Sequence, residues 1–156
     1  HIQQENSKIS KLLSAKPLEL SSAVSNLGQR YLDLQKSYRQ LSAEIMLKDA
    51  KHIPMHDSIL YTAVLADYEA MHVFCNCCIK KGISTVMVLA KTEVGYAYVI
   101  MSKSIDLQLI RTEFNKRIYA KGGGNSEMMQ GSCTATPTEI SHVFSTLTGV
   151  TMHIVS

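Results

Sequence analysis

A stripe of apolar residues at alternating steps of four and three runs through the first third of the chain. Leucine fills every second position, and valine, tyrosine or isoleucine fills the others. The members of this heptad face are Leu20, Val24, Leu27, Tyr31, Leu34, Tyr38, Leu41 and Ile45. The spacing predicts a helix that begins near Pro17 and spans about 30 residues, or roughly 45 Å. A small domain cannot cover so long a stripe, so the heptad face requires a partner.

Two partners for the heptad face are compatible with the sequence. One is a second copy of the chain, and the other is a short helix predicted at residues 7–14, which would cover the face only partway. An apolar seam sustained over several heptads favours a coiled coil between copies, so we expect a homodimer. Tyr31 and Tyr38 indicate a looser seam than leucine and isoleucine would form.

The pattern changes after Ala50, where Pro54 in the segment KHIPMHDS ends the helix. Apolar, β-branched runs and helical patterns then alternate to the end of the chain, with a loop at the glycine-rich segment 121–132. Strands are expected at residues 59–65, 85–90, 96–101 and 151–155, and helices at residues 67–80, 106–119 and 137–147. The predicted fold is an α/β domain with a mixed sheet, preceded by a long heptad-patterned helical arm. Its predicted parts are the arm at 1–50, a linker at 51–57 and the domain at 58–156.

The composition excludes several classes of protein. A hydrophobic fraction of 46% and a charged fraction of 19% are typical of folded, soluble domains. No apolar run reaches the roughly 18 residues of a membrane span, and no signal peptide opens the chain. Three of the four cysteines crowd into CNCC, which is not a spaced disulfide framework and fits a reducing compartment. We expect a cytoplasmic protein without membrane association and, since the sequence begins at His1, a fragment of a longer one.

The run Gly122, Gly123 and Gly124 stands within the segment KGGGNSEMMQGS. Glycine is retained where φ must be positive or where something approaches the main chain closely. The run is therefore either a contact surface or a flexible turn. Positive charge collects just before it, because residues 103–121 hold five basic and two acidic residues. That charge favours contact with a phosphate backbone, although a solvated helix face would show it too.

Motifs for catalysis or metal binding are incomplete. His52 and His56 have the HxxxH spacing of zinc ligands, but Pro54 breaks the helix that would align them. Cys75 and Cys78 form a CxxC motif without a second ligand pair, which predicts buried structural thiols. Nucleotide-binding glycine motifs and a nucleophile elbow are absent, and the acidic residues are scattered. We expect neither a catalytic site nor a metal site in this chain.

The segment GGGNSEMMQGS lies between a basic helix and a helix that begins at a proline, and it resembles the glycine-rich signature of the DHH-associated domain. The upstream segment ISKLLSAKPLELSSAVSNLGQRYLDLQKSYRQLSAEI is similar to the helices that precede this domain in alanyl-tRNA editing proteins and alanyl-tRNA synthetases. Together the two segments extend the resemblance over nearly the whole chain. DHH phosphoesterases usually have histidine where Asn125 stands, whereas Met129 and Gln130 agree with the alanyl-tRNA proteins.

This resemblance implies a non-catalytic module of a protein that removes wrongly attached serine or glycine from alanine tRNA. The zinc-binding editing domain is not in this chain, so zinc is expected only there. The implied partner is tRNA, specifically alanine tRNA. Two alternatives stay open: an accessory domain of a DHH-type phosphoesterase or nuclease that binds nucleic acid, and a purely structural dimerisation domain.

The tRNA contact implied by the resemblance combines bare backbone with cations, because RNA backbone or exposed bases approach glycine closely. Its expected residues are Gly122, Gly123, Gly124, Asn125, Gln130, Lys121, Lys116, Arg117 and Arg111. Asn115 and Tyr119 follow Arg111 at four-residue steps, opposite the apolar face of the helix, and are expected to extend the same surface.

Overall fold

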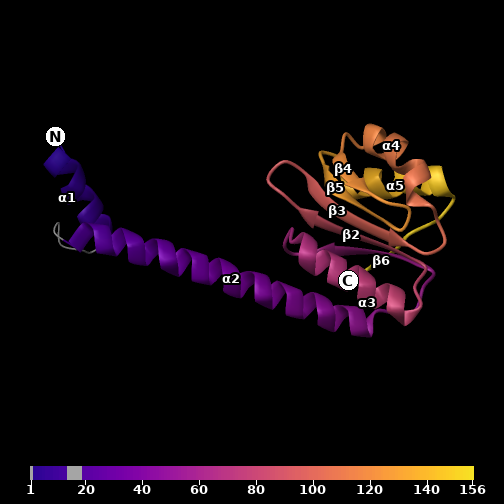
Figure 1. The fold of residues 1–156 in the computed structure, drawn as a ribbon, viewed down its shortest axis with the longest axis horizontal. Helices are drawn as coiled ribbons and strands as arrows, with labels where there is room; N and C mark the ends of the chain where they lie inside the picture. The colour runs from indigo at the N-terminus through magenta and orange to yellow at the C-terminus, as the bar shows by residue number, and fades with distance from the viewer. Residues whose placement is uncertain (1, 14–18) are drawn as a thin grey trace. The chain divides into compact units, whose positions relative to one another are not determined.

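The computed structural model describes residues 2–13 and 19–156, and the chain divides into two compact units, residues 1–40 and 41–156 (Figure 1). The first unit holds α1 (Ile2–Leu13) and most of α2 (Leu20–His52), a helix of 33 residues. The long heptad-patterned helix is thus confirmed. The short helix predicted at residues 7–14 falls within α1 as far as Leu13, while Ser14 and Pro17 lie outside the described residues.

Six strands of the second unit form one sheet in the order β4-β5-β3-β2-β1-β6. Their bounds are Ser58–Ala63 for β1, Thr85–Lys91 for β2, Tyr96–Ser102 for β3, Lys121–Gly124 for β4, Met128–Cys133 for β5 and His153–Val155 for β6. β1 runs parallel to β2 and β6, and the other neighbouring pairs are antiparallel. The predicted α/β domain with a mixed sheet is confirmed.

Three helices cover the two faces of this sheet: α3 (Tyr68–Lys81), α4 (Leu107–Arg117) and α5 (Pro137–Thr148). Figure 1 shows α3 on one side and α4 and α5 on the other. On the α3 side, Phe74 stacks on Tyr61 at 4.3 Å between ring centroids, and Met46 of α2 joins the same core. On the other side, Phe114 makes edge contacts with Tyr98 and Phe144 at 5.6 and 6.1 Å. Burial on both faces explains why the central strands are almost continuously apolar.

Local capping signals fix the ends of the helices. The Asp67 side chain accepts a hydrogen bond from the Glu69 amide at the start of α3, and Gly82, with φ of 113°, ends that helix. Thr136 and Glu139 form a capping box at the start of α5. The predicted helix limits therefore agree with the structure to within a few residues.

The glycine-rich segment is a β-hairpin, so the loop expected from the sequence is wrong. Lys121–Gly124 and Met128–Cys133 pair as antiparallel strands, with Gly123 opposite Gln130. Glycine has low strand propensity, and its bare backbone gave no alternation from which to predict β4. The pairing with β5, whose buried face carries Met129, supplies the stability that β4 lacks locally.

The last turns of α2 contribute to the second unit. Met46 and Ala50 are buried in the core of the α3 side, and Ile53 follows them directly after the helix. Tyr61 donates a hydrogen bond to Asp49 at 2.7 Å between Oη and Oδ2. The predicted division at residues 51–57 concerns independently folding parts, and it stays a prediction.

Candidate nucleic-acid interface

β4 is an edge strand, and its glycines differ in what surrounds them. Gly122 lies opposite Gly131 of β5. A Cβ atom at position 122 would lie 2.5 Å from the Tyr98 hydroxyl and would also collide with the Gln130 carbonyl. Packing inside the domain therefore requires glycine at position 122.

Gly124 is required for a different reason. Its φ of +149° is one that other residues rarely adopt, and a Cβ there would collide with the Met128 carbonyl. The Arg111 guanidinium donates a hydrogen bond to the Gly124 carbonyl, and Asn125 Oδ1 accepts from the amides of Glu127 and Met128 at 2.9 and 3.0 Å. Arg111 and Asn125 thus hold the hairpin together, and their role in binding stays a prediction.

Nothing among the described residues requires glycine at position 123. No heavy atom lies within 4 Å of a Cβ placed there, and the residue does not have positive φ. A β-branched residue would suit an exposed strand better, so glycine at this position lowers strand stability without improving packing. Glycine in a strand often marks a place where a ligand or another backbone approaches closely. Gly123 is the strongest candidate contact in the hairpin.

Lys121, Gly123, Gln130 and Ser132 share one face of the hairpin, because residues paired across a ladder project to the same side. Lys121, Gly123 and Ser132 are exposed, and Gln130 is half-buried. Three of these four residues were predicted from the sequence to contact tRNA, and Ser132 was not. The structure brings all four together on the α3 side of the sheet.

Two side chains of α3 form hydrogen bonds with β5. A ring nitrogen of His72 hydrogen-bonds with Gln130 Oε1, and the Tyr68 hydroxyl donates to the Gly131 carbonyl at 2.9 Å. These partners are 58 and 63 residues apart in the chain, so no local pattern could have connected them. We name the surface formed by Lys121, Gly123, Gln130, Ser132 and His72 the hairpin face.

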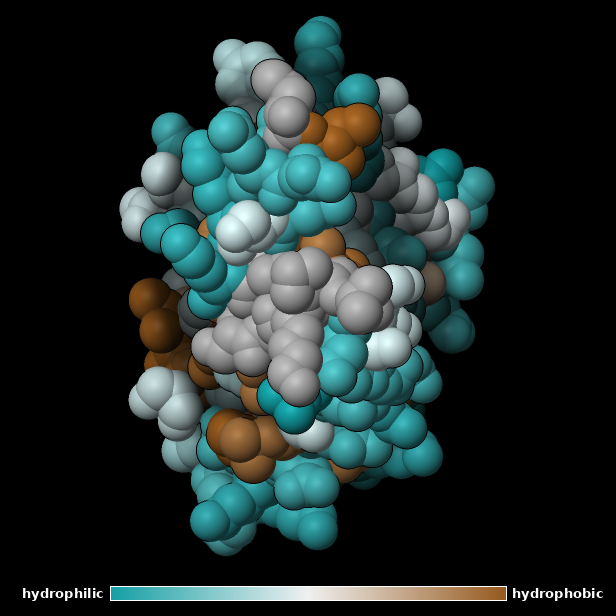
Figure 2. Space-filling view, turned by 90° about the vertical axis from the view of Figure 1, so that its left-hand side faces the viewer, coloured by the Kyte–Doolittle hydropathy of each residue, from teal (hydrophilic) through white to brown (hydrophobic). Residues whose placement is uncertain are grey.

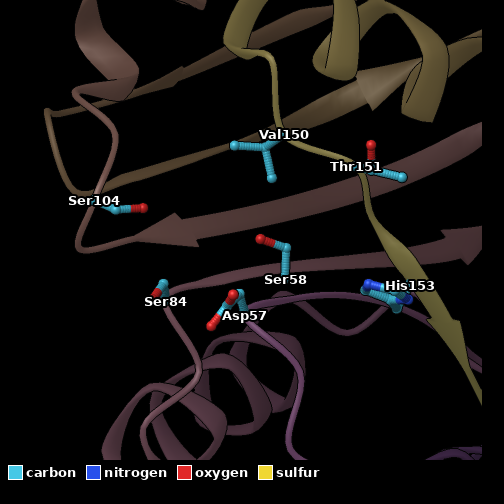
Figure 3. Close-up of a pocket in the computed structure, with 7 residues that line it drawn as sticks. All are labelled: Asp57, Ser58, Ser84, Ser104, Val150, Thr151 and His153. Carbon is cyan, nitrogen blue, oxygen red and sulfur yellow. The ribbon is translucent and has the colours of Figure 1, made fainter.

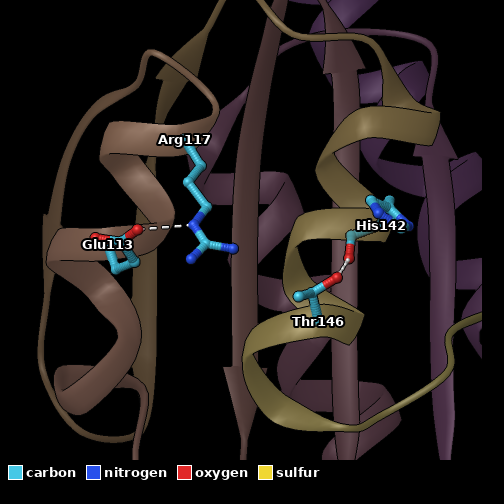
Figure 4. A network of polar contacts seen from close by, with 4 residues as sticks. All are labelled: Glu113, Arg117, His142 and Thr146. Carbon is cyan, nitrogen blue, oxygen red and sulfur yellow. Dashed lines mark hydrogen bonds and ion pairs between the residues drawn. The ribbon is translucent and has the colours of Figure 1, made fainter.

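The predicted cations at the end of α4 and the start of β4 are exposed but not equivalent. Arg117 pairs with Glu113 at 2.7 Å (Figure 4), and its hydrogen bond lowers the pKa of Glu113. The side chains of Lys116 and Lys121 make no hydrogen bond or salt bridge within the described part of the chain. These two lysines are therefore the cations most available to a phosphate group.

Of the two residues expected to extend the surface along α4, Asn115 and Tyr119, the exposed one is Tyr119, and its role in binding stays a prediction. The Tyr98 hydroxyl donates to Asn115 Oδ1 at 2.6 Å, and burial raises the pKa of Tyr98. Asn115 is thus turned toward the sheet, and Arg111 is bound to the hairpin, whereas Tyr119 is 80% exposed.

A separate polar pocket of about 510 Å³ lies where β1, β2 and β6 begin (Figure 3). It is lined by Asp57, Ser58, Ser84, Ser104, Val150, Thr151 and His153. His153 also stacks on His56 at 4.4 Å between ring centroids. In open α/β sheets, ligands usually bind outside the carboxyl ends of parallel strands, and this pocket is at their amino ends. None of its lining residues belongs to the hairpin face, so the pocket is not part of the candidate interface.

The heptad face is not covered by the parts of the chain that the structure describes. Val24 to Ile45 of the stripe have exposed fractions of 44 to 69%, and only Leu20 is half-buried. In α2 the buried residues are Ser42, Met46 and Ala50, which belong to another side of the helix. The molecular face drawn in Figure 2 is mainly hydrophilic, with hydrophobic residues in small separate groups. The heptad face is a continuous exposed apolar stripe, and such a stripe indicates an interaction site more strongly than scattered apolar residues do.

Two features are absent from the described residues: a cluster of metal-ligating side chains and a membrane-spanning helix. No group of three or more His, Cys, Asp or Glu side chains is positioned to hold a metal ion there. The same part of the chain contains no helix that is both long and apolar enough to cross a membrane. Cys75 and Cys78 are buried free thiols in α3, as predicted.

Comparisons with known proteins give a fold likeness and no sequence match. No protein-family model matches the chain, and no curated protein does. Two structures of RecJ from Thermus thermophilus, in complex with Mg²⁺ and with Mn²⁺, each align with a TM-score of 0.52 over 90% of this chain. Their sequence identities are 13% and 14%. This chain shares its fold with part of RecJ.

The aligned region is a small part of RecJ, because the chain spans 22% and 21% of the two RecJ chains. The C-Ala domain of Aquifex aeolicus alanyl-tRNA synthetase also aligns, with a TM-score of 0.44 and 18% identity over 61% of this chain and 92% of that domain. The RecJ likeness agrees with the predicted mixed-sheet fold, and it concerns the fold alone.

Proposed function

We propose that this chain is a non-catalytic module that binds tRNA, specifically alanine tRNA, and pairs with a second copy through its helical arm. Its parent protein would be an alanyl-tRNA editing protein or a relative of alanyl-tRNA synthetase. The proposal assigns deacylation, and the zinc that it needs, to a separate editing domain.

Gly123 is the observation that carries the proposal. Its missing side chain leaves open space on an edge strand, two residues from Lys121 and on the same face as Lys121 and Gln130. An edge strand presents unpaired amide and carbonyl groups, and amides donate well to phosphate oxygens. Side chains at position 123 would hold a polyanion away from those groups.

The expected affinity of one domain is low. Lys116, Lys121 and the paired Arg117 would neutralise about three phosphates, which implies micromolar or weaker binding at physiological salt. Two copies held by one coiled coil would raise the apparent affinity without any new contact. The uncovered heptad face, with seven of its eight positions exposed, supports such pairing.

The binding proposal is tested by titrating labelled alanine tRNA against the chain at about 50 and about 200 mM salt. We expect binding that weakens at the higher salt, and Gly123→Val to weaken it about tenfold or more because the new side chain blocks the strand edge. Lys121→Gln should weaken binding and lower the salt dependence by about one phosphate contact. Lys103→Gln is the matched control. Lys103 is exposed and directly follows the last residue of β3, and the loss of its charge should change tRNA binding little.

The alternatives predict other outcomes of the same titration. An accessory domain of a DHH-type phosphoesterase or nuclease, which the fold likeness to RecJ over 90% of the chain supports, should prefer a short single-stranded oligonucleotide to folded tRNA. A purely structural dimerisation domain should bind neither. Unchanged tRNA binding in Gly123→Val would show that the hairpin is not the contact.

A further inference from the structure

Tyr119 occupies a backbone position where glycine is usual. α4 ends at Arg117, and the Tyr119 and Ala120 amides donate to the Lys116 and Asn115 carbonyls at 3.4 and 2.8 Å. This is the Schellman pattern, in which the residue after the helix cap adopts the left-handed conformation. Tyr119 has φ of +54° and is the one residue other than glycine with positive φ among those the structure describes.

The tyrosine side chain at this position makes no contact that would stabilise the described part of the fold. Tyr119 is 80% exposed, and its hydroxyl makes no hydrogen bond with any described residue. The left-handed conformation strains a residue with a Cβ, and buried contacts usually compensate for such strain. Here the ring is in solvent, so the strain has no compensation within the domain.

Exposure alone would not distinguish Tyr119. Leu109, Val94 and Ile154 are exposed to a similar degree, at 82, 78 and 82%, and single exposed apolar residues are common. Tyr119 differs because its backbone is strained, its side chain is a flat ring, and it stands between Lys116 and Lys121. An aromatic ring flanked by available cations is the arrangement that stacks on a base while the neighbouring phosphates are neutralised.

We infer that Tyr119 is a stacking platform for an unpaired nucleic-acid base, held outward by its left-handed backbone at the start of the hairpin. The inference rests on the proposed nucleic-acid binding and deepens it, because it names an unpaired base as part of the ligand. Lys116 and Lys121 lie within two or three residues of the ring and would contact the phosphates on either side of that base. Strain retained at a binding residue is a known trade of stability for function.

The test measures binding and stability together in Tyr119→Gly and Tyr119→Phe. The probes are an RNA hairpin with a six-nucleotide single-stranded extension and a blunt hairpin with the same stem. We expect Tyr119→Gly to bind the extended hairpin about 5- to 150-fold more weakly and the blunt one unchanged. The same variant should melt about 2–4 °C higher, because glycine removes the strain. Tyr119→Phe should match the wild type in both measurements.

Leu109→Ala is the matched control, since it removes an equally exposed apolar side chain from the other end of α4. If Tyr119→Gly binds both hairpins as tightly as the wild type, or binds both more weakly by the same factor, the inference is overturned while the proposed function stands. A change in oligomeric state in Tyr119→Gly would mean that the ring packs against a second copy, which also overturns it. If the wild type binds neither these hairpins nor tRNA, the proposed function fails and the inference fails with it.

Discussion

Gly122 and Gly123 are neighbours in the chain, but the fold constrains only one of them. We expect Gly122→Ala to destabilise the domain by about 1–3 kcal/mol, because the new Cβ overlaps the Tyr98 hydroxyl and the backbone of β5. Gly123→Ala should change the free energy of unfolding by less than about 0.5 kcal/mol, since its Cβ enters open space. Denaturant unfolding of the two variants measures this. Equal destabilisation would contradict the packing argument.

At this scale the sequence predicted which residues gather at the hairpin, but not how the fold constrains each of them. It identified the glycine run, the cations before it and Gln130 as one surface, and the structure places Lys121, Gly123 and Gln130 on one face. It could not separate Gly123 from its neighbours, because three identical letters carry no information about Tyr98 or the backbone of β5. The role of His72 could not be predicted from the sequence either, because the contact of His72 with Gln130 exists only after the sheet forms.

At the scale of the element, the buried thiols of α3 predict a pH dependence with a definite sign. Burial raises the pKa of Cys78 to about 11, with Cys77 adding to the shift and Lys81 opposing it, and burial also raises the pKa of Cys75. Cys78 should react more than about 100-fold more slowly than a free cysteine at about pH 7.5, since the thiolate is the reactive form, and Cys75 should also react more slowly. Mass spectrometry after timed alkylation measures the rates, and urea-unfolded protein is the control.

The same pKa shifts make stability depend on pH. A folded pKa above the unfolded value of about 8.5 favours the native state below that pH, where both states keep the proton. The contribution is lost as pH rises from there through about 11, because the unfolded chain then releases the proton more readily. The free energy of unfolding should therefore fall between about pH 8 and about pH 10.5, and Cys78→Ala should flatten that fall. If the free energy of unfolding of Cys78→Ala falls as steeply with pH as that of the wild type, Cys78 is not the cause of the fall.

α2 gives the second prediction at this scale. Leu34 is 69% exposed at the centre of the heptad face. A charge buried in an apolar seam is strongly unfavourable, so Leu34→Glu should convert a dimer into a monomer while the helix and the sheet domain stay folded. Sedimentation over a range of concentrations measures the state. Asp33→Glu, on an adjacent polar position, is the control, and a wild type that is monomeric at high concentration would contradict the proposed pairing.

The periodicity of α2 is plain in the sequence, but the second role of the helix is not. The heptad residues dominate the pattern, whereas Ser42, Met46 and Ala50 form a weaker stripe near its end. That weaker stripe is the one the fold buries. The sequence therefore predicted the arm correctly and left unseen that the end of the same helix completes the core on the α3 side.

At the scale of the whole molecule, this second role predicts where the chain can be divided. The fragment 58–156 loses Met46, Ala50 and Ile53, each less than 5% exposed, and the hydrogen bond from Tyr61 to Asp49. Exposing core positions of this kind costs about 2–5 kcal/mol each for the larger side chains, and domains are stable by only about 5–15 kcal/mol. We expect fragment 58–156 to be unfolded or loosely packed and fragment 41–156 to fold cooperatively.

Thermal unfolding followed by near-ultraviolet circular dichroism separates the two fragments, because fixed tyrosine packing gives a signal that a loose core lacks. Fragment 41–156 keeps the hairpin face, Tyr119 and both available lysines but loses most of the heptad face. It should therefore remain monomeric and bind tRNA with the weak affinity of a single site, while the full chain binds more tightly through its second copy. If fragment 58–156 is as stable as fragment 41–156, the core does not need α2, and the boundary predicted at residues 51–57 is the correct one.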